Sequence, residues 1–371
     1  MLTLNGGGKV NHINKFSLVL LSFILLIFLG CQSQFMTAGK IYIDQENYDV
    51  AIEQFKKAVE AEPQNPETYI WLGKAYAYKK LYEEACKQTE KGLLLDSKKI
   101  DELKNDASFD YWAVFFNAGM KHVNNKDFKS ALKRIERSLD FEPKSAKSLN
   151  YLAYCFEKLD RDDDALKTYK KAIEFVPDNI EAYINLGNFY KDREKLEEQE
   201  SVLKKARKIV ENPDWLKAES KEIIKRRKKA KAKVYIELGN NLLMQEKPEE
   251  AEVVLKKAIE LMPEDKDVNF NYGLALLKLE KYVDAIQSFK IVSSLDSLDK
   301  EGHFYLGFSY LKAEKYNEAI GAFTKVIEID PDYCEAYLDR AFAERELGNK
   351  NAAYEDAKLS SECEKRKESK E

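Results

Sequence analysis

The sequence predicts an all-α protein, an α-solenoid of about nine helical hairpins, and three observations support this. The first is composition: 34% of the residues are charged and 12% are aromatic, against only 15 Gly and 8 Pro in 371 residues, which suits long helices with solvated outer faces. A hydrophobic content of 44% supplies a sizeable core and is too high for a disordered chain. The other two observations are recurring phrases of sequence.

One phrase is a small residue, a bulky residue four positions later, a second small residue three after that, and often a proline five further on. Spacings of four and three place these side chains on one helical face, and the proline ends the helix because it has no backbone donor. Each occurrence therefore predicts one amphipathic helix. The occurrences are Ala51, Phe55, Ala58 and Pro63; Ala165, Tyr169, Ala172 and Pro177; Ala251, Leu255, Ala258 and Pro263; and Ala319, Phe323, Val326 and Pro331.

The companion phrase, about twelve residues upstream, is a bulky residue followed by Gly or Ala. A mid-helix Gly costs roughly 1 kcal/mol relative to Ala, so its return at one register predicts close helix contact there. Short polar turns join the two phrases, and each pair therefore predicts a helical hairpin. Examples of the companion phrase are Leu72-Gly73, Leu186-Gly187, Leu238-Gly239, Tyr272-Gly273 and Leu306-Gly307.

This 34-residue pattern resembles the tetratricopeptide repeat, and the resemblance covers nearly all of the chain after residue 31. It implies that neighbouring hairpins stack into a right-handed superhelix with one continuous core. Thr89 and Gly92 depart from the usual bulky and small residues, and Gln199 replaces the usual Ala. The predicted organisation is a signal in 1–30, two repeats in 31–99, an insertion in 100–111, three repeats in 112–213, a basic helical insertion in 214–231, four repeats in 232–367 and a charged tail in 368–371.

The first thirty residues have the form of a secretory signal, with Lys9 and Lys15 before an apolar run at 16–29 that is short for a membrane span. The run ends in Phe28-Leu29-Gly30-Cys31, which resembles the lipobox of bacterial lipoproteins although that family usually has an aliphatic residue in place of Phe28. The resemblance implies acyl chains on Cys31, which would hold the protein at a bilayer. By the family's sorting rule, Gln32 implies the outer membrane, facing the periplasm, or the cytoplasmic membrane in a cell with a single membrane. The alternative is an uncleaved signal anchor.

In the tetratricopeptide family the first helices of successive repeats line a concave groove, so their register gives candidate partner-binding residues. Large aromatics anchor interfaces and amides can hold a peptide backbone, although aromatics on helices also pack between neighbouring helices. Glu237, Glu301 and Tyr305 stand where a clamp for a terminal carboxylate needs cations, so the expected ligand is an extended or helical segment with apolar anchors. The candidates are Trp71, Tyr78, Phe116, Asn117, Tyr151, Tyr154, Asn185, Asn188, Asn240, Phe270, Asn271, Phe304, Tyr305, Phe308 and Phe342.

The second insertion carries five consecutive cations, Lys225, Arg226, Arg227, Lys228 and Lys229, within a helical pattern that is expected to lengthen the first helix of the sixth repeat. They are candidates for docking an acidic partner or anionic lipid headgroups. The alternative is a solvated helix extension, because charge runs on helices usually face water.

No catalytic, cofactor or metal motif is present, and the three histidines, His12, His122 and His303, are far apart in the sequence. A formal net charge of −4 gives no reason to expect nucleic acid as a partner. Cys334 and Cys363 lie at adjacent ends of one predicted hairpin and could pair, but free, partly buried thiols are predicted for these two and for Cys86 and Cys155.

The sequence thus favours a membrane-anchored, non-catalytic scaffold lipoprotein that binds another protein of the bacterial cell envelope. The alternative is a ligand-binding or docking subunit of an envelope transport system.

Overall fold

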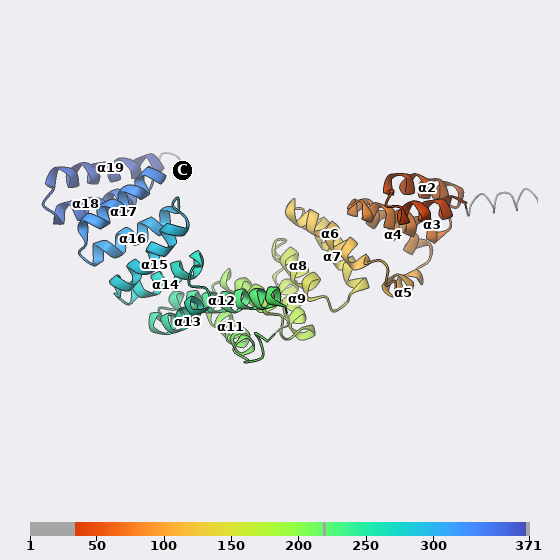
Figure 1. Ribbon diagram of the computed structural model, residues 1–371, viewed down its shortest axis with the longest axis horizontal. Helices are drawn as coiled ribbons and strands as arrows, with labels where there is room; N and C mark the ends of the chain where they lie inside the picture. Colours follow the sequence, from red (N-terminus) through yellow and green to blue (C-terminus); the bar gives the residue numbers. More distant parts are fainter. Residues whose placement is uncertain (1–33, 218–219, 369–371) are drawn as a thin grey trace, which may run out of the picture. The chain divides into compact units, whose positions relative to one another are not determined.

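The computed structural model describes residues 34–217 and 220–368, and every regular element in these ranges is an α-helix (Figure 1). The predicted all-α solenoid is confirmed. The predicted signal and Cys31 lie outside the described residues.

Apart from α5 (Lys99–Lys104), which lies in the first insertion, the helices alternate as the first and second members of hairpins. The first helices are residues 34–44, α3 (Pro66–Tyr78), α6 (Tyr111–Asn124), α8 (Ala146–Glu157), α10 (Ile180–Lys191), α12 (Lys221–Met244), α14 (Lys266–Lys278), α16 (Lys300–Lys312) and α18 (Cys334–Glu346). The second helices are α2 (Tyr48–Ala61), α4 (Tyr82–Leu95), α7 (Phe128–Phe141), α9 (Asp162–Phe175), α11 (Leu196–Val210), α13 (Pro248–Leu261), α15 (Tyr282–Leu295), α17 (Tyr316–Ile329) and α19 (Lys350–Glu368).

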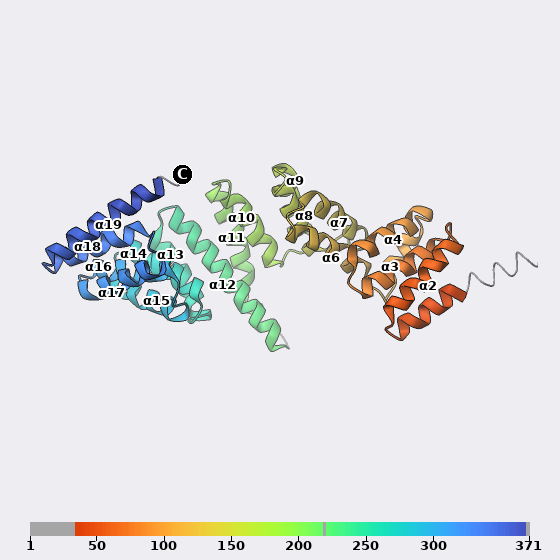
Figure 2. The same ribbon diagram turned by 90° about the horizontal axis from the view of Figure 1, so that it is seen from above.

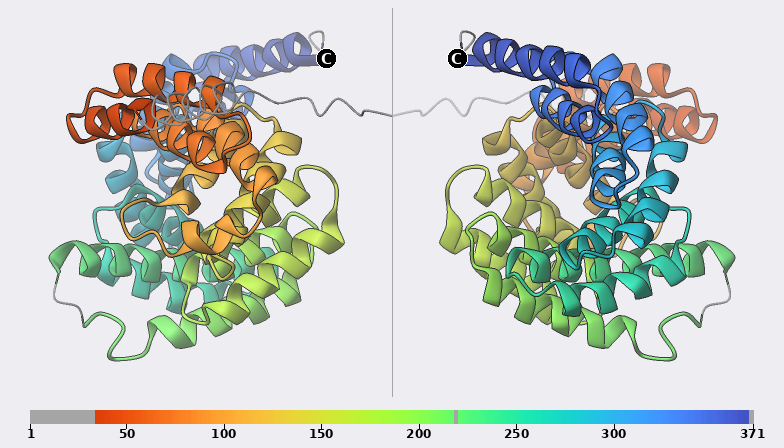
Figure 3. Two further views of the ribbon diagram at one scale, coloured as in Figure 1. Left: turned by 90° about the vertical axis from the view of Figure 1, so that its right-hand side faces the viewer. Right: turned by 90° about the vertical axis from the view of Figure 1, so that its left-hand side faces the viewer.

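The chain divides into two compact units, an N-terminal unit that ends at Phe175 and a C-terminal unit that begins at Val176. Within each unit a helix packs mainly on the helices before and after it in the sequence, as Figure 3 shows for the paired helices of the hairpins. In the C-terminal unit, α12 has 24 residues and so includes the basic run, as the sequence predicted (Figure 2).

The turn inside each hairpin has one residue in the left-handed region, and eight of these residues are not glycine. Successive positions are 34 residues apart except across the two insertions, so both units share one turn register. The positions are Glu46, Lys80, Lys126, Asp160, Glu194, Glu246, Glu280, Glu314 and Gly348.

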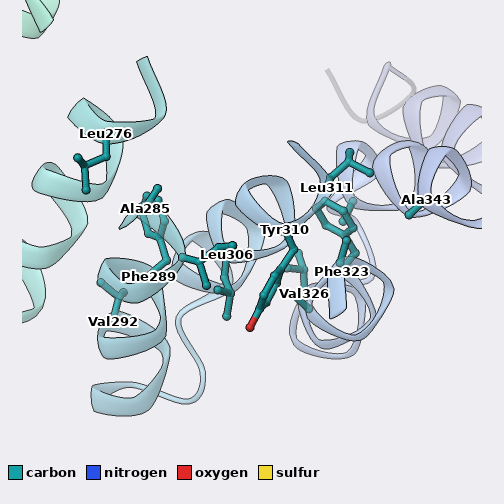
Figure 4. Packing of buried hydrophobic residues seen from close by; sticks show 14 residues of the cluster. Leu276, Ala285, Phe289, Val292, Leu306, Tyr310, Leu311, Phe323, Val326 and Ala343 are labelled. Carbon is teal, nitrogen blue, oxygen red and sulfur yellow. The ribbon is translucent and has the colours of Figure 1, made fainter. Parts of the chain in front are cut away.

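The two recurring phrases meet in the core, where the small residue of a first helix lies against the bulky residue of its second helix. A Cβ added to Gly273 would lie 2.7 Å from the Phe289 ring, which is fully buried in the cluster of Figure 4. In the second repeat, Thr89 and Gly92 replace the usual bulky and small residues, and the helix contact changes accordingly. Gly73 faces the small Thr89, while Gly92 brings α4 so close to α3 that a Cβ would lie 2.9 Å from the Pro66 carbonyl oxygen.

The cysteines correct one prediction. Cys334 and Cys363 form a disulfide that joins the start of α18 to α19, because the antiparallel hairpin places their Cα atoms 5.5 Å apart. Cys86 and Cys155 are free and buried, and burial raises the pKa of both thiols.

Across residues 34–217 and 220–368, none of the helices combines the length and apolar character needed to cross a bilayer.

Candidate functional site

On the first helices of the C-terminal unit, two sets of residues occupy equivalent positions in successive repeats and remain accessible. Each set forms a row, and the two rows together are called the C-terminal surface. The first helices contact one another from α10 to α12, α12 to α14 and α16 to α18, so their residues form neighbouring parts of this surface. Nine of the ten residues are half-buried and Phe342 is exposed. One row is Asn185, Glu237, Asn271, Tyr305 and Asp339, and the other is Asn188, Asn240, Leu274, Phe308 and Phe342.

The aromatic candidates of this unit separate into two groups. Phe270 and Tyr305 meet edge to face at 5.5 Å, and Tyr305 stacks on buried Phe289 at 5.6 Å, so these rings pack between hairpins. Phe304 likewise packs on Tyr333, with ring centroids 5.0 Å apart. The more open apolar side chains lie on α18, where Phe342 is 43% exposed and Leu338 is 55% exposed. Phe308 is half-buried beside Lys312, whose Nζ lies 5.2 Å from the ring centroid.

The amides differ in their hydrogen bonding. Within the described residues, the side chains of Asn185, Asn188 and Asn240 make no hydrogen bond, so their donors and acceptors remain available to a bound backbone. Asn271 instead donates from its amide to the Asp267 carbonyl oxygen at 2.8 Å, one turn earlier in α14. The three available amides lie on α10 and α12.

Asp339 is a site residue that sequence reasoning missed. Its half-buried carboxylate has no ion pair or hydrogen bond in the described part of the chain. Burial raises the pKa of Asp339 to about 6, an effect that Lys312 opposes and Glu335 reinforces. The available signal was its register, because Asp339 follows Tyr305 by one 34-residue period.

In the N-terminal unit the corresponding side chains are largely engaged by the chain itself. Trp71 contacts the ammonium groups of Lys40 and Lys74, whose Nζ atoms are 4.5 and 4.6 Å from its ring centroid. Lys74 is 6% exposed and its Nζ lies 2.6 Å from the carboxylate of Asp106, which belongs to the first insertion. The insertion therefore covers part of the predicted groove face of α3.

Tyr78 belongs to the same arrangement. Its ring stacks on Tyr48 at 5.2 Å and meets Phe109 of the insertion edge to face at 5.5 Å. The side chain is still 39% exposed. Trp71 and Tyr78 thus line one cluster together with residues from the insertion.

Phe116 corrects the sequence prediction, because it is only 2% exposed and does not line an open surface. Its ring stacks on Trp112 at 5.0 Å and contacts Tyr151 edge to face at 5.6 Å, and Lys147 covers it at 4.6 Å. Asn117, Tyr151 and Tyr154 are half-buried.

The five consecutive cations on α12 do not form a uniform patch. Lys225, Arg226, Lys228 and Lys229 are exposed. Arg227 is half-buried, and its guanidinium donates to the carbonyl oxygens of Trp215 and Lys217 at 2.8 and 3.0 Å. Arg227 therefore holds the preceding loop, and four cations remain open to solvent.

A cavity of about 460 Å³ lies beside the first insertion, between residues 103–112 and the end of α7. Tyr111 lines it, and its buried hydroxyl has no hydrogen-bond partner among the residues that the structure describes. Sequence reasoning did not anticipate this cavity, since no motif marks it.

Comparison with protein-family models finds the tetratricopeptide repeat. The matches span residues 39–79 and 156–192, residues 180–209, residues 236–294 and residues 300–333, and together they cover about half of the chain. The prediction that this chain is built from tetratricopeptide repeats is thereby confirmed.

Curated relatives match through part of their length only. Over 166 residues the chain is 27% identical to the protein O-mannosyl-transferase TMTC3 of Homo sapiens, covering 44% of this chain and 18% of that protein. Over 160 residues it is 28% identical to the Hsp70-Hsp90 organizing protein of Triticum aestivum, covering 42% of this chain and 24% of that protein. The chain thus spans less than a quarter of the length of either relative.

Among solved structures, Pseudomonas aeruginosa PilF is similar to this chain with a TM-score of 0.50 and 18% identity, covering 67% of this chain and 99% of that one. YrrB, described as a repeat protein with an unusual peptide-binding site, gives a TM-score of 0.42 and 23% identity over 54% of this chain and 95% of that one. At these identities the PilF likeness supports the solenoid fold alone.

Proposed function

Because the chain belongs to the tetratricopeptide repeat family, whose repeats mediate protein–protein interactions, we propose that it is a non-catalytic scaffold that binds another protein. The observation that carries the proposal is the C-terminal surface, whose two rows stay accessible on five successive first helices.

The C-terminal surface fits an extended or helical segment of a partner. Phe342, together with Leu338 one turn before it at the edge of the surface on α18, provides apolar contacts. The amides of Asn185, Asn188 and Asn240 can hold backbone groups. Neither row contains a Lys or Arg, although Lys312 and Arg345 lie beside Phe308 and Phe342. A partner side chain that carries positive charge would be complementary to Asp339.

The proposal places the protein in the bacterial cell envelope as a lipoprotein of the outer membrane, or of the cytoplasmic membrane in a cell that has no other. The lipobox-like sequence ending at Cys31 supports acylation there. The disulfide between Cys334 and Cys363 supports an oxidising, exported location, because such bonds are rare in the cytosol.

Partner binding is tested by co-purification from gently crosslinked, detergent-solubilised cells. A Leu338→Ala/Phe342→Ala variant should lose one specific protein that accompanies the wild type. The matched control is Val253→Ala/Val283→Ala, which truncates two residues, each 60% exposed, on the second helices α13 and α15 of the same unit. Equal recovery of every protein with all three forms would refute binding at this surface.

Anchoring is tested separately with Cys31→Ser. Membrane fractionation and intact-mass measurement should show an acylated wild type and a Cys31→Ser variant that has neither lipid nor processing at this site. A wild type that stays in the membrane without acyl mass would instead support an uncleaved signal anchor.

A second candidate function, a ligand-binding subunit of an envelope transport system, is favoured only by the cavity beside Tyr111 and its unpartnered hydroxyl. Its test is small-molecule binding to the wild type and to Tyr111→Phe, which removes the hydroxyl and keeps the ring. Co-purified metabolites that depend on this hydroxyl would favour the second function.

A further inference from the structure

The N-terminal part of α12, residues 221–231, extends beyond the packed core and is called the α12 extension. The other first helices of the C-terminal unit have 12 or 13 residues, whereas α12 has 24. No residue of the α12 extension is buried, and the first buried residue of the helix is Ala232. Figure 2 shows this end of α12 reaching past its neighbours.

The α12 extension concentrates positive charge on a chain whose formal net charge is −4. Its charged residues are the cations Lys221, Lys225, Arg226, Arg227, Lys228, Lys229 and Lys231 and a single acid, Glu222. The segment therefore has the opposite sign from the protein as a whole.

Five of these cations are exposed, and they have almost no intramolecular compensation. Lys221, Lys225, Lys228 and Lys229 form no ion pair within residues 34–217 and 220–368. Arg226 lies 3.6 Å from Glu222, but these side chains are 78% and 66% exposed, so the pair contributes little to stability. Arg227 faces the other way and holds Trp215 and Lys217, which fixes the extension's orientation on the preceding loop.

The arrangement of the cations distinguishes between classes of partner. At 3.6 residues per turn they spread over about half of the helix circumference, and within residues 221–231 no row of apolar side chains runs between them. A protein partner is usually held by a few buried anchors, whereas a bilayer surface accepts a broad band of cations around a shallow apolar contact. Ile223, 44% exposed, lies closer to the Arg227 side of the helix than to the middle of this band, so the contact with a bilayer is mainly electrostatic.

We propose that the α12 extension adsorbs on a bilayer surface that presents anionic phospholipid headgroups, and so attaches the C-terminal unit to a membrane. Each cation near such a surface strengthens binding about fivefold, so five exposed cations suffice for stable but salt-sensitive attachment. The contact is independent of lipid on Cys31 and of partner binding on the C-terminal surface.

The test is hydrogen exchange of residues 221–231 in the full chain, held on vesicles of phosphatidylcholine with or without phosphatidylglycerol. Local exchange is the readout because the apolar run at 16–29 can bind vesicles of either composition. Exchange in the α12 extension should slow at least about tenfold on the anionic vesicles only, and high salt should reverse the effect.

The test variant is Lys225→Gln/Arg226→Gln/Lys228→Gln/Lys229→Gln, which keeps helix propensity and leaves Arg227 in place. It should show the same exchange on both kinds of vesicle. The control removes the same charge from four exposed lysines of the N-terminal unit, as Lys56→Gln/Lys57→Gln/Lys129→Gln/Lys133→Gln, and should behave as the wild type. Equal exchange of the wild type on both vesicles, or slowing produced only by an acidic polypeptide such as polyglutamate, would overturn the proposal.

Discussion

The two units repeat one hairpin design, and Lys74 on α3 and Asp339 on α18 show two different environments of a charge on a first helix. In the N-terminal unit, Lys74 is buried and compensated, with Asp106 at 2.6 Å and Trp71 at 4.6 Å. In the C-terminal unit, Asp339 is half-buried and has no ion pair in the described residues. The shared repeat pattern therefore determines which helix faces pack together. The charge and the pairing of the side chains outside those faces differ between these two positions.

The pKa shifts of the two carboxyls express the same contrast. Burial alone would raise the pKa of Asp106, but hydrogen bonds from Lys74 and Ser108 outweigh it and lower the pKa. At Asp339 burial prevails and raises the pKa to about 6. A compensated charge is compatible with a covered surface, and an uncompensated one suits a surface that a partner completes.

The largest expected difference between the units is their response to reduction. The Cys334–Cys363 bond closes 29 residues of chain, so reducing it should destabilise the hairpin of α18 and α19 by roughly 3–4 kcal/mol. The N-terminal unit should not respond, because its Cys86 and Cys155 are free and buried. Hydrogen exchange with and without reductant measures both units in one sample. Equal protection of the α18–α19 hairpin under both conditions would show that the bond does not stabilise it.

Lys74→Met tests the compensated charge. It keeps an unbranched side chain against Trp71 but leaves Asp106 without its cation, and should lower unfolding stability by about 2 kcal/mol. Urea unfolding can be followed by tryptophan fluorescence. The control at the C-cap of the same helix, Lys79→Met, removes a more exposed pair with Asp49 and should change stability by less than about 0.5 kcal/mol. Similar losses for both variants would contradict a special role for Lys74.

Asp339→Asn tests the uncompensated charge and should raise the stability of the folded protein, whereas Lys74→Met should lower it. Because the folded-state pKa of Asp339 exceeds its ordinary value, the folded protein binds more protons between about pH 4 and pH 6, and stability from this group falls as pH rises through that window. The variant should be about 1 kcal/mol more stable than the wild type at pH 7 and should lose this advantage near pH 4. The pair is compared by urea unfolding at both pH values. An advantage that does not change with pH would show that Asp339 is not the titrating group.

The smallest expected effect concerns the turn register that the units share. Glu46→Gly and Glu280→Gly each replace a residue with φ near +59° or +58° and should raise stability by about 0.5 kcal/mol, one in each unit. Glu53→Gly, inside α2, should instead lower stability by about 1 kcal/mol. Thermal unfolding of the three variants provides the comparison, and a loss of stability at either turn would break the equivalence of the two units.

The sequence predicted the packed elements of this protein better than its accessible surface. The helical hairpins, the tetratricopeptide repeats and the lengthening of α12 were all predicted, because helix period, turn position and small-to-bulky packing recur locally. Predicting the candidate surface was harder. The register selected Phe342 and the amides of α10 and α12, but it also selected buried Phe116 and internally packed Phe270, and it missed Asp339.

By itself, the sequence determined which faces of the helices pack. The reason is that the two helices of each hairpin, which contact each other, belong to the same 34-residue repeat. Only the tertiary structure decided that Asp106 covers Lys74, that Arg227 is tied to Trp215, and that Cys334 reaches Cys363. Each of these contacts joins groups 12 to 32 residues apart in the sequence and depends on which group lies beside the side chain in the folded structure. Helical periodicity carries no information about that choice, because it specifies the direction of a side chain and not its neighbour.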